Sequence, residues 1–131
     1  MQTRVESMPD ALNTMNEIVV KKMEFKIIKC PSYLVGRRFD KTVNLEQRCF
    51  VAAWEPEDIL VGLSEEFKKI GKVGMQWRFD IGHWLTSYRL SGGNFTLLVT
   101  LQAPGNSILM QDDPTVNNYK TVGTFIISDE K

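Results

Sequence analysis

The chain has 131 residues, of which 43% are hydrophobic and 24% charged, and these values are ordinary for a globular domain. Its 16 basic and 16 acidic residues cancel, so overall charge argues against attraction to nucleic acid or to an anionic membrane. The length favours a single domain over residues 1–131 that can bury a core, and we expect residues 1–6 to be disordered.

The first element predicted along the chain is a short helix. Ser7 is a candidate N-cap, and Pro9 and Asp10 suit the first helical turn. We expect this helix to end near Glu17, because the pattern from Ile18 onward moves toward the two-residue period of a strand.

An N-terminal pair of strands is predicted next. Apolar and charged residues alternate over residues 23–27, which indicates a half-buried strand, and Pro31 interrupts the pattern. Residues 33–39 form a second extended segment that we expect to pair with the first. Residues 40–54 fit neither the helical period nor the strand period.

The clearest helix covers residues 56–70. Pro56 is tolerated in a first helical turn, where its missing N–H has no helical partner, and Gly71 supplies a natural end. An apolar stripe at helical spacing is expected to face a sheet. The stripe consists of Ile59, Leu63, Phe67 and Ile70.

Residues 75–110 predict an antiparallel β-meander whose register follows from its turns. A two-residue turn at Gly92-Gly93 places Trp84 opposite Leu101, with apolar residues along one face. We expect two further turns, at Gly82-His83 and at Pro104-Gly105, to carry this face onto the flanking strands.

The flanking turns define specific neighbours. The first turn pairs Ile81 with Trp84, and the second pairs Leu101 with Ile108. An alternative keeps the hairpin at Gly92-Gly93 but runs one bent strand, with a bulge, through Gly82.

Together these elements predict an α+β fold. Its parts are the N-terminal strand pair, one main amphipathic helix over residues 56–70, the meander over residues 75–110 and a last strand near residues 119–127. The helix is expected to pack on the apolar face of the sheet.

No pattern in the chain indicates catalysis, a metal or a cofactor, so we expect a non-enzymatic protein. His83, the only histidine, lies in a predicted turn. Cys30 and Cys49 match no zinc or redox motif, and we expect two reduced thiols. A cytoplasmic location is expected, because neither a signal peptide nor a membrane-spanning segment is visible.

A contact with a protein partner, or with a second copy of the chain, is the function that we expect first. The second face of the meander mixes polar residues with leucines, whereas a wholly solvated face would be polar. Trp54, just before the main helix, is not readily assigned to the core. The candidate interface residues are Leu85, Leu98, Leu109 and Trp54.

Two other kinds of binding stay open. Trp77, Trp84 and Tyr88 share one face of neighbouring strands, and such clusters are usually core but can also wall a small-molecule pocket. A basic cluster on the N-terminal strand pair could bind nucleic acid or phosphate, whereas lysines also protect an edge strand from aggregation. Its members are Lys21, Lys22, Lys26, Lys29, Arg37 and Arg38.

The segment Met-Glu-Phe-Lys-Ile-Ile-Lys-Cys-Pro-Ser-Tyr-Leu-Val-Gly-Arg-Arg-Phe, residues 23–39, resembles the opening strand of GyrI-like effector-binding domains. The shared features are an apolar run, a proline and a Val-Gly step. The resemblance implies binding of a small-molecule effector. It transfers no functional residue, because the second half of the chain shows no second helix and no matching pocket glutamate.

Overall fold

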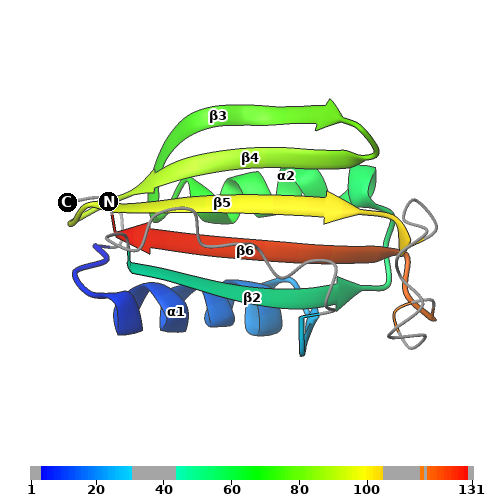
Figure 1. The fold of residues 1–131 in the computed structure, drawn as a ribbon, viewed down its shortest axis with the longest axis horizontal. Helices are drawn as coiled ribbons and strands as arrows, with labels where there is room; N and C mark the ends of the chain where they lie inside the picture. Colours follow the sequence, from blue (N-terminus) through cyan, green and yellow to red (C-terminus); the bar gives the residue numbers. More distant parts are fainter. Residues whose placement is uncertain (1–3, 31–43, 105–115, 117, 130–131) are drawn as a thin grey trace.

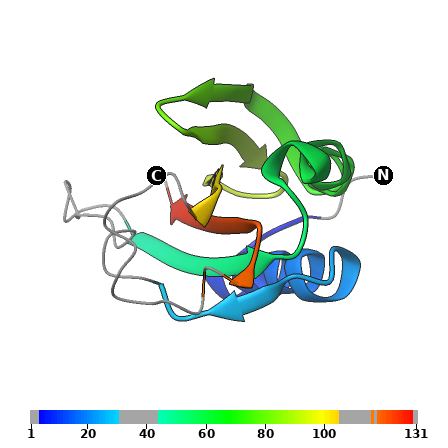
Figure 2. The same cartoon turned by 90° about the vertical axis from the view of Figure 1, so that its right-hand side faces the viewer.

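The computed structural model of the chain describes residues 4–30, 44–104, 116 and 118–129, and it contains one six-stranded antiparallel sheet in the order β1-β2-β6-β5-β4-β3 (Figure 1). Both helical segments cover the same face of this sheet (Figure 2). The predicted α+β class is confirmed. None of the helices in the described ranges is long and apolar enough to cross a membrane.

Helix α1 (Met8–Asn16) begins where the sequence predicts, because the Ser7 hydroxyl accepts a hydrogen bond from the Asp10 N–H across 3.2 Å. The chain then continues as a π-helical segment, η1 (Glu17–Lys22), so the prediction of strand-like structure from Ile18 is wrong. Four buried residues explain the continuation, because their spacing of i, i+4, i+7 and i+8 marks one side of a helix. They are Ala11, Met15, Ile18 and Val19.

The segment before α1 contributes one residue, Val5, to the core, whereas Arg4 and Glu6 beside it are exposed. Of the segment expected to be disordered, residues 1–3 lie outside the described ranges. Val5 is 0% exposed, and its N–H donates to the carbonyl of Ser91. This bond joins the N-terminus to the end of strand β4 (His83–Leu90). The burial of Val5 and this backbone bond tie the segment directly before α1 to the sheet.

Strand β1 (Lys26–Ile28) pairs with β2 (Asn44–Ala52). The expected pairing of residues 23–27 with residues 33–39 is not tested by this contact, because β1 is an edge strand with a second side. Residues 33–39 lie outside the described ranges. Strand β2 runs through the stretch that fits neither period, and its four last residues, 49–52, are all buried. A strand buried on both faces loses the alternation that marks a half-buried strand.

Helix α2 (Pro56–Phe67) has its predicted start and its predicted apolar stripe, since Ile59, Leu63, Phe67 and Ile70 are all buried. The helix ends earlier than predicted, and a turn after Phe67 leads into strand β3 (Gly71–Asp80). Gly71 is required at this junction, because a side-chain carbon there would overlap the carbonyl group of Arg89.

The central hairpin, β4 and β5 (Phe95–Gln102), has the predicted register: Trp84 faces Leu101 and Thr86 faces Val99. The other neighbour of β5 is β6 (Thr121–Asp129), with Leu101 facing Gly123. The predicted pairing of Leu101 with Ile108 is therefore wrong, and residues 105–115 lie outside the described ranges. The predicted last strand exists, but it lies inside the sheet between β5 and β2.

The turn between β3 and β4 consists of Ile81-Gly82, one residue earlier than predicted. As a result, Trp84 faces Phe79 in place of Ile81. Two irregularities in β3, between Val73 and Met75 and between Met75 and Arg78, shift the register further. The structure therefore combines a true hairpin through this turn with bulges in the edge strand.

Candidate functional site

Exposed apolar side chains gather at the tip of the β3–β4 hairpin. Phe79 is 56% exposed and Ile81 is 86% exposed. The ring of Trp84 meets the ring of Phe79 edge to face, with centroids 5.2 Å apart. We call Phe79, Ile81 and Trp84 the hairpin-tip patch. The sequence analysis placed Ile81 opposite Trp84 on the apolar face, yet the structure leaves Ile81 and Phe79 open to solvent.

The backbone of Ile81 is in the left-handed region, with φ of 46°, and Gly82 follows with φ of 85°. Two successive positive φ angles define the hairpin turn that favours Asn or Gly. A β-branched residue is unfavourable there, because its side chain crowds the backbone. Turn formation therefore does not explain why this position holds an exposed isoleucine.

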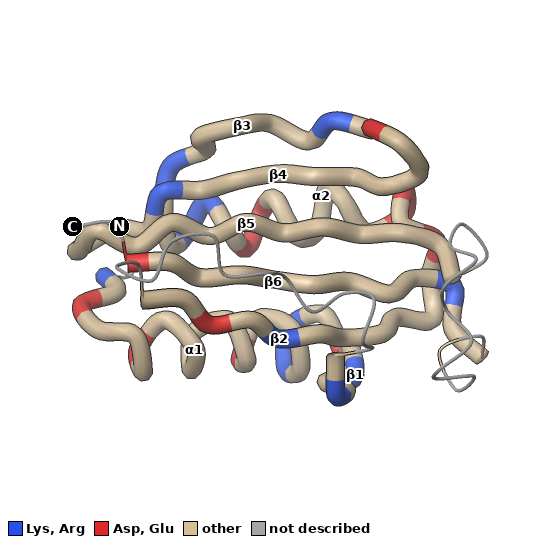
Figure 3. Tube along the Cα trace, in the orientation of Figure 1, with Lys and Arg blue, Asp and Glu red and all other residues tan. Residues whose placement is uncertain are grey.

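Acidic residues occupy the start of α2 (Figure 3), and one of them, Glu57, contacts Trp84 of the hairpin-tip patch. The Trp84 indole nitrogen donates to Oε1 of Glu57 across 3.3 Å. Two further exposed acidic residues, Glu55 and Asp58, lie close to Glu57 in the sequence. Val61 is 70% exposed and lies one helical turn beyond Glu57, on the same side of α2. The surface thus combines apolar side chains with local negative charge.

Two of the three candidate pocket residues line a cavity. Trp77 and Tyr88 border a space of about 260 Å³ between α2 and the β3–β4 hairpin. Trp84 does not line this space, because its ring turns toward Phe79 and Glu57. The candidate pocket of the sequence analysis is thus divided between a cavity and a surface patch.

The candidate interface residues do not form one surface. Leu85 and Leu98 lie half-buried on the sheet face opposite the helices. Trp54 is 46% exposed after the end of β2, and its ring packs against Phe25 with centroids 6.2 Å apart. Leu109 lies outside the described ranges.

The basic cluster is spread over different elements. Lys21 and Lys22 end η1, whereas Lys26 and Lys29 lie in β1 and just after it. All four are exposed, and the exposed Glu24 lies between them in the chain. Arg37 and Arg38 lie outside the described ranges. The four described lysines therefore come from two neighbouring segments, η1 and the stretch over and just after β1.

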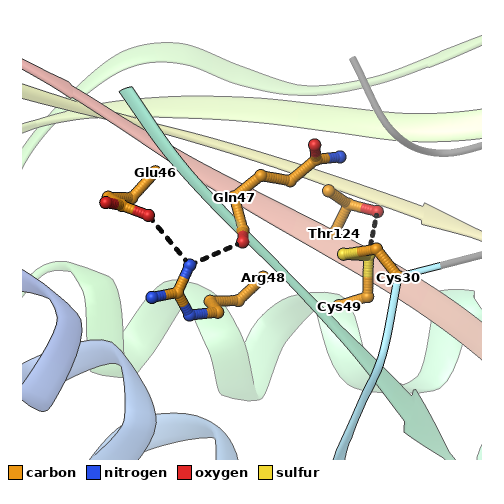
Figure 4. Close-up of a disulfide and its surroundings, with 6 residues drawn as sticks. All are labelled: Cys30, Glu46, Gln47, Arg48, Cys49 and Thr124. Atoms are coloured by element: carbon orange, nitrogen blue, oxygen red, sulfur yellow. Dashed lines mark hydrogen bonds and ion pairs between the residues drawn. A yellow bond between two sulfur atoms is a disulfide. The ribbon is translucent and has the colours of Figure 1, made fainter. Parts of the chain in front are cut away.

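Cys30 and Cys49 form a disulfide, which corrects the expectation of two reduced thiols (Figure 4). The bond ties the chain after β1 to the buried middle of β2, where Ile28 already faces Cys49. The Cys49 sulfur also contacts the Thr124 hydroxyl of β6 across 3.6 Å. The spacing of the two cysteines in the sequence does not predict this disulfide, because the antiparallel pairing of β1 with β2 brings them together.

Among the described residues, no group of three or more histidine, cysteine or acidic side chains is arranged to hold a metal ion. Comparisons with protein-family models, curated proteins and solved structures found no match to this chain. The resemblance of residues 23–39 to GyrI-like domains therefore stays a prediction, and function has to be argued from the surface and the cavity.

Proposed function

We propose that the chain is a non-enzymatic binding protein that contacts a partner protein through the hairpin-tip patch. The observation that supports this most directly is Ile81, which is 86% exposed and takes a backbone conformation that suits Asn or Gly. The residue makes the turn less favourable and gains no burial within the chain. Contact with another protein gives such a residue a function, as it does for other exposed apolar patches.

The carboxylates at the start of α2 define the chemistry of the partner. Glu57 contacts Trp84, and Glu55 and Asp58 flank it. Interfaces commonly combine an apolar centre with a charged rim, and complementary charge selects the partner. The expected partner presents apolar side chains flanked by lysine or arginine. A symmetric dimer through this patch would bring the same carboxylates together, so a different protein is favoured over a second copy.

A random peptide library displayed on phage tests this proposal, because the selection does not require the partner to be identified first. The wild-type chain is expected to select peptides that combine aromatic or aliphatic residues with lysine or arginine. A synthetic peptide of the selected consensus is then titrated against the wild type and against Ile81→Asn. The asparagine suits the turn, so this variant removes the apolar contact and leaves the fold in place.

The matched control is Val20→Ala, which removes an exposed apolar residue from η1 at a distance from the patch. The Ile81→Asn variant is expected to weaken binding of the consensus peptide about tenfold, and Val20→Ala is expected to leave its affinity unchanged. A peptide that binds both variants equally well would contradict the proposal. Sedimentation of the same proteins measures self-association, and a dimer that Ile81→Asn dissociates would identify a second copy as the partner.

A further inference from the structure

The cavity between α2 and the β3–β4 hairpin contains a buried polar group without a partner. Tyr88 is 3% exposed and lines this cavity. No side chain or backbone group in the described part of the chain hydrogen-bonds to its hydroxyl. Buried tyrosine hydroxyls normally have a partner, because an unpaired buried hydroxyl costs free energy. The Tyr88 hydroxyl is therefore open to a polar atom of a bound molecule or of water.

Three other polar side chains around the cavity, those of Trp77, Ser64 and Thr86, take part in hydrogen bonds within the chain. The Trp77 indole nitrogen donates to the Ser64 hydroxyl across 2.8 Å, and the Thr86 hydroxyl donates to the Met75 carbonyl across 2.7 Å. These bonds fix the orientation of both side chains before anything binds. The Tyr88 ring is held against Phe67 edge to face, with centroids 5.3 Å apart. The aromatic walls of the cavity are thus preorganised, which lowers the entropic cost of binding a ligand.

The charge of the lining favours an anion. The described residues that border the cavity include one charged side chain, the exposed Lys68 directly after α2, and no carboxylate. Val73 and Gln76 are exposed as well, so they border the opening together with Lys68. A ligand that enters between these residues passes the Lys68 side chain, and Tyr88 belongs to the buried part of the lining.

The size of the cavity sets the size of the ligand. A closed cavity of about 150 Å³ is enough to hold benzene. The space of about 260 Å³ therefore accepts one aromatic ring with polar substituents at both ends. A planar ring also suits the indole of Trp77, since aromatic pairs stack or meet edge to face.

From these observations we infer that the cavity is a binding site for a small aromatic carboxylate with a second polar group on its ring. The carboxylate lies beside the Lys68 ammonium at the opening, the ring packs against Trp77, and the second polar group hydrogen-bonds to the Tyr88 hydroxyl. This site is separate from the hairpin-tip patch, because Phe79, Ile81 and Trp84 do not border the cavity.

Three related compounds test the site: para-hydroxybenzoate, benzoate, which lacks the hydroxyl, and phenol, which lacks the carboxylate. NMR titrations follow the indole N–H signal of Trp77. The wild type is expected to bind para-hydroxybenzoate about threefold to tenfold more tightly than benzoate, as one hydrogen bond contributes. It is expected to bind para-hydroxybenzoate about twofold to fivefold more tightly than phenol, as one exposed ion pair contributes.

Two variants test whether the preference over benzoate depends on Tyr88 and the preference over phenol on Lys68. Tyr88→Phe removes the hydroxyl alone, which makes no hydrogen bond within the described chain, so the fold is retained and the preference over benzoate is lost. Lys68→Gln removes the charge alone, and the preference over phenol is lost. Lys72→Gln is the matched control, because Lys72 is exposed in β3 but does not border the cavity, and it changes neither preference.

The proposal is overturned if para-hydroxybenzoate leaves the Trp77 indole signal in place up to its solubility limit. It is also overturned if phenol binds the wild type as tightly as para-hydroxybenzoate does, or if Tyr88→Phe retains the full preference over benzoate. Loss of each preference in its own variant, with the control unchanged, supports it.

Discussion

Trp84 donates its indole hydrogen to Glu57, and this contact links the tip of the β3–β4 hairpin to the first turn of α2 across 27 positions of the sequence. The same tryptophan packs against the exposed ring of Phe79. The contact therefore joins the apolar and the acidic parts of the proposed interface.

The coupling between these two residues can be measured directly. In a double-mutant cycle of Trp84→Phe and Glu57→Gln, we expect an interaction free energy of about 0.5–1 kcal/mol, because one hydrogen bond at a solvent-exposed site is lost in either single variant. Urea unfolding of the four proteins gives this value. Strict additivity of the two substitutions would show that the bond contributes nothing to stability.

The strained turn predicts that one surface substitution stabilises the protein. Ile81→Asn replaces a β-branched residue at φ of 46° by one that tolerates this region. We expect the free energy of unfolding to rise by about 1 kcal/mol, since left-handed backbone costs roughly 1–2 kcal/mol for an ordinary residue. Thermal and urea unfolding check this, and an unfolding midpoint below that of the wild type would contradict it.

A close contact in the sheet predicts a destabilising substitution. Gly123 of β6 faces Phe50 of β2, and a side-chain carbon at Gly123 would overlap the phenylalanine ring. We expect Gly123→Ala to lower the free energy of unfolding, measured in urea, by about 1–3 kcal/mol through overpacking.

A second glycine provides the comparison for this substitution. Gly62 lies inside α2, where an added carbon would meet only the flexible end of Met23, at 3.1 Å from its Cε. Because alanine favours a helix over glycine by about 1 kcal/mol, Gly62→Ala is expected to be neutral or stabilising. Equal losses in both alanine variants would refute the explanation from the Phe50 ring.

The disulfide predicts a stability that depends on the redox state. Cys30 and Cys49 are separated by 19 positions. Closing a loop of this size contributes about 3 kcal/mol in the chain-entropy description. We expect a thiol reductant to lower the free energy of unfolding by this amount. The doubly substituted variant Cys30→Ser, Cys49→Ala is the control, because the reductant has no bond to break in it.

The same cysteines test the expected cytoplasmic location, which stays a prediction. A reducing cytoplasm keeps cysteines as thiols, whereas disulfides persist in oxidising compartments. Alkylation of intact producing cells, followed by mass spectrometry, distinguishes the two states. Unmodified Cys30 and Cys49 would oppose a cytoplasmic location.

Local signals in the sequence predict adjacent elements well. The Gly92-Gly93 turn and the alternation on either side define the pairing of Trp84 with Leu101, because a two-residue turn leaves no freedom of register. At the preceding turn the same method fails by one residue. The pattern places His83 in that turn, and it does not indicate that Ile81 adopts a left-handed conformation there.

Periodicity and turn residues do not predict which strands pair when they are far apart in the sequence. Strand β5 pairs with β6, and β1 pairs with β2, across long segments of the chain. Alternation shows that such a segment is a strand but contains no information on its neighbour. The disulfide is likewise a contact between distant parts of the sequence, because the pairing of β1 with β2 is what places Cys30 beside Cys49.

The sequence by itself determined the α+β class, the apolar stripe of α2 and the central hairpin, because periodicity and turn chemistry act between neighbouring residues. It also predicted that Trp77, Trp84 and Tyr88 share one face of neighbouring strands. Only the tertiary structure decided that α2 leaves a cavity over Tyr88 and leaves Ile81 in solvent. Periodicity reports which residues share a face, whereas the packing of a distant helix determines which part of that face is covered.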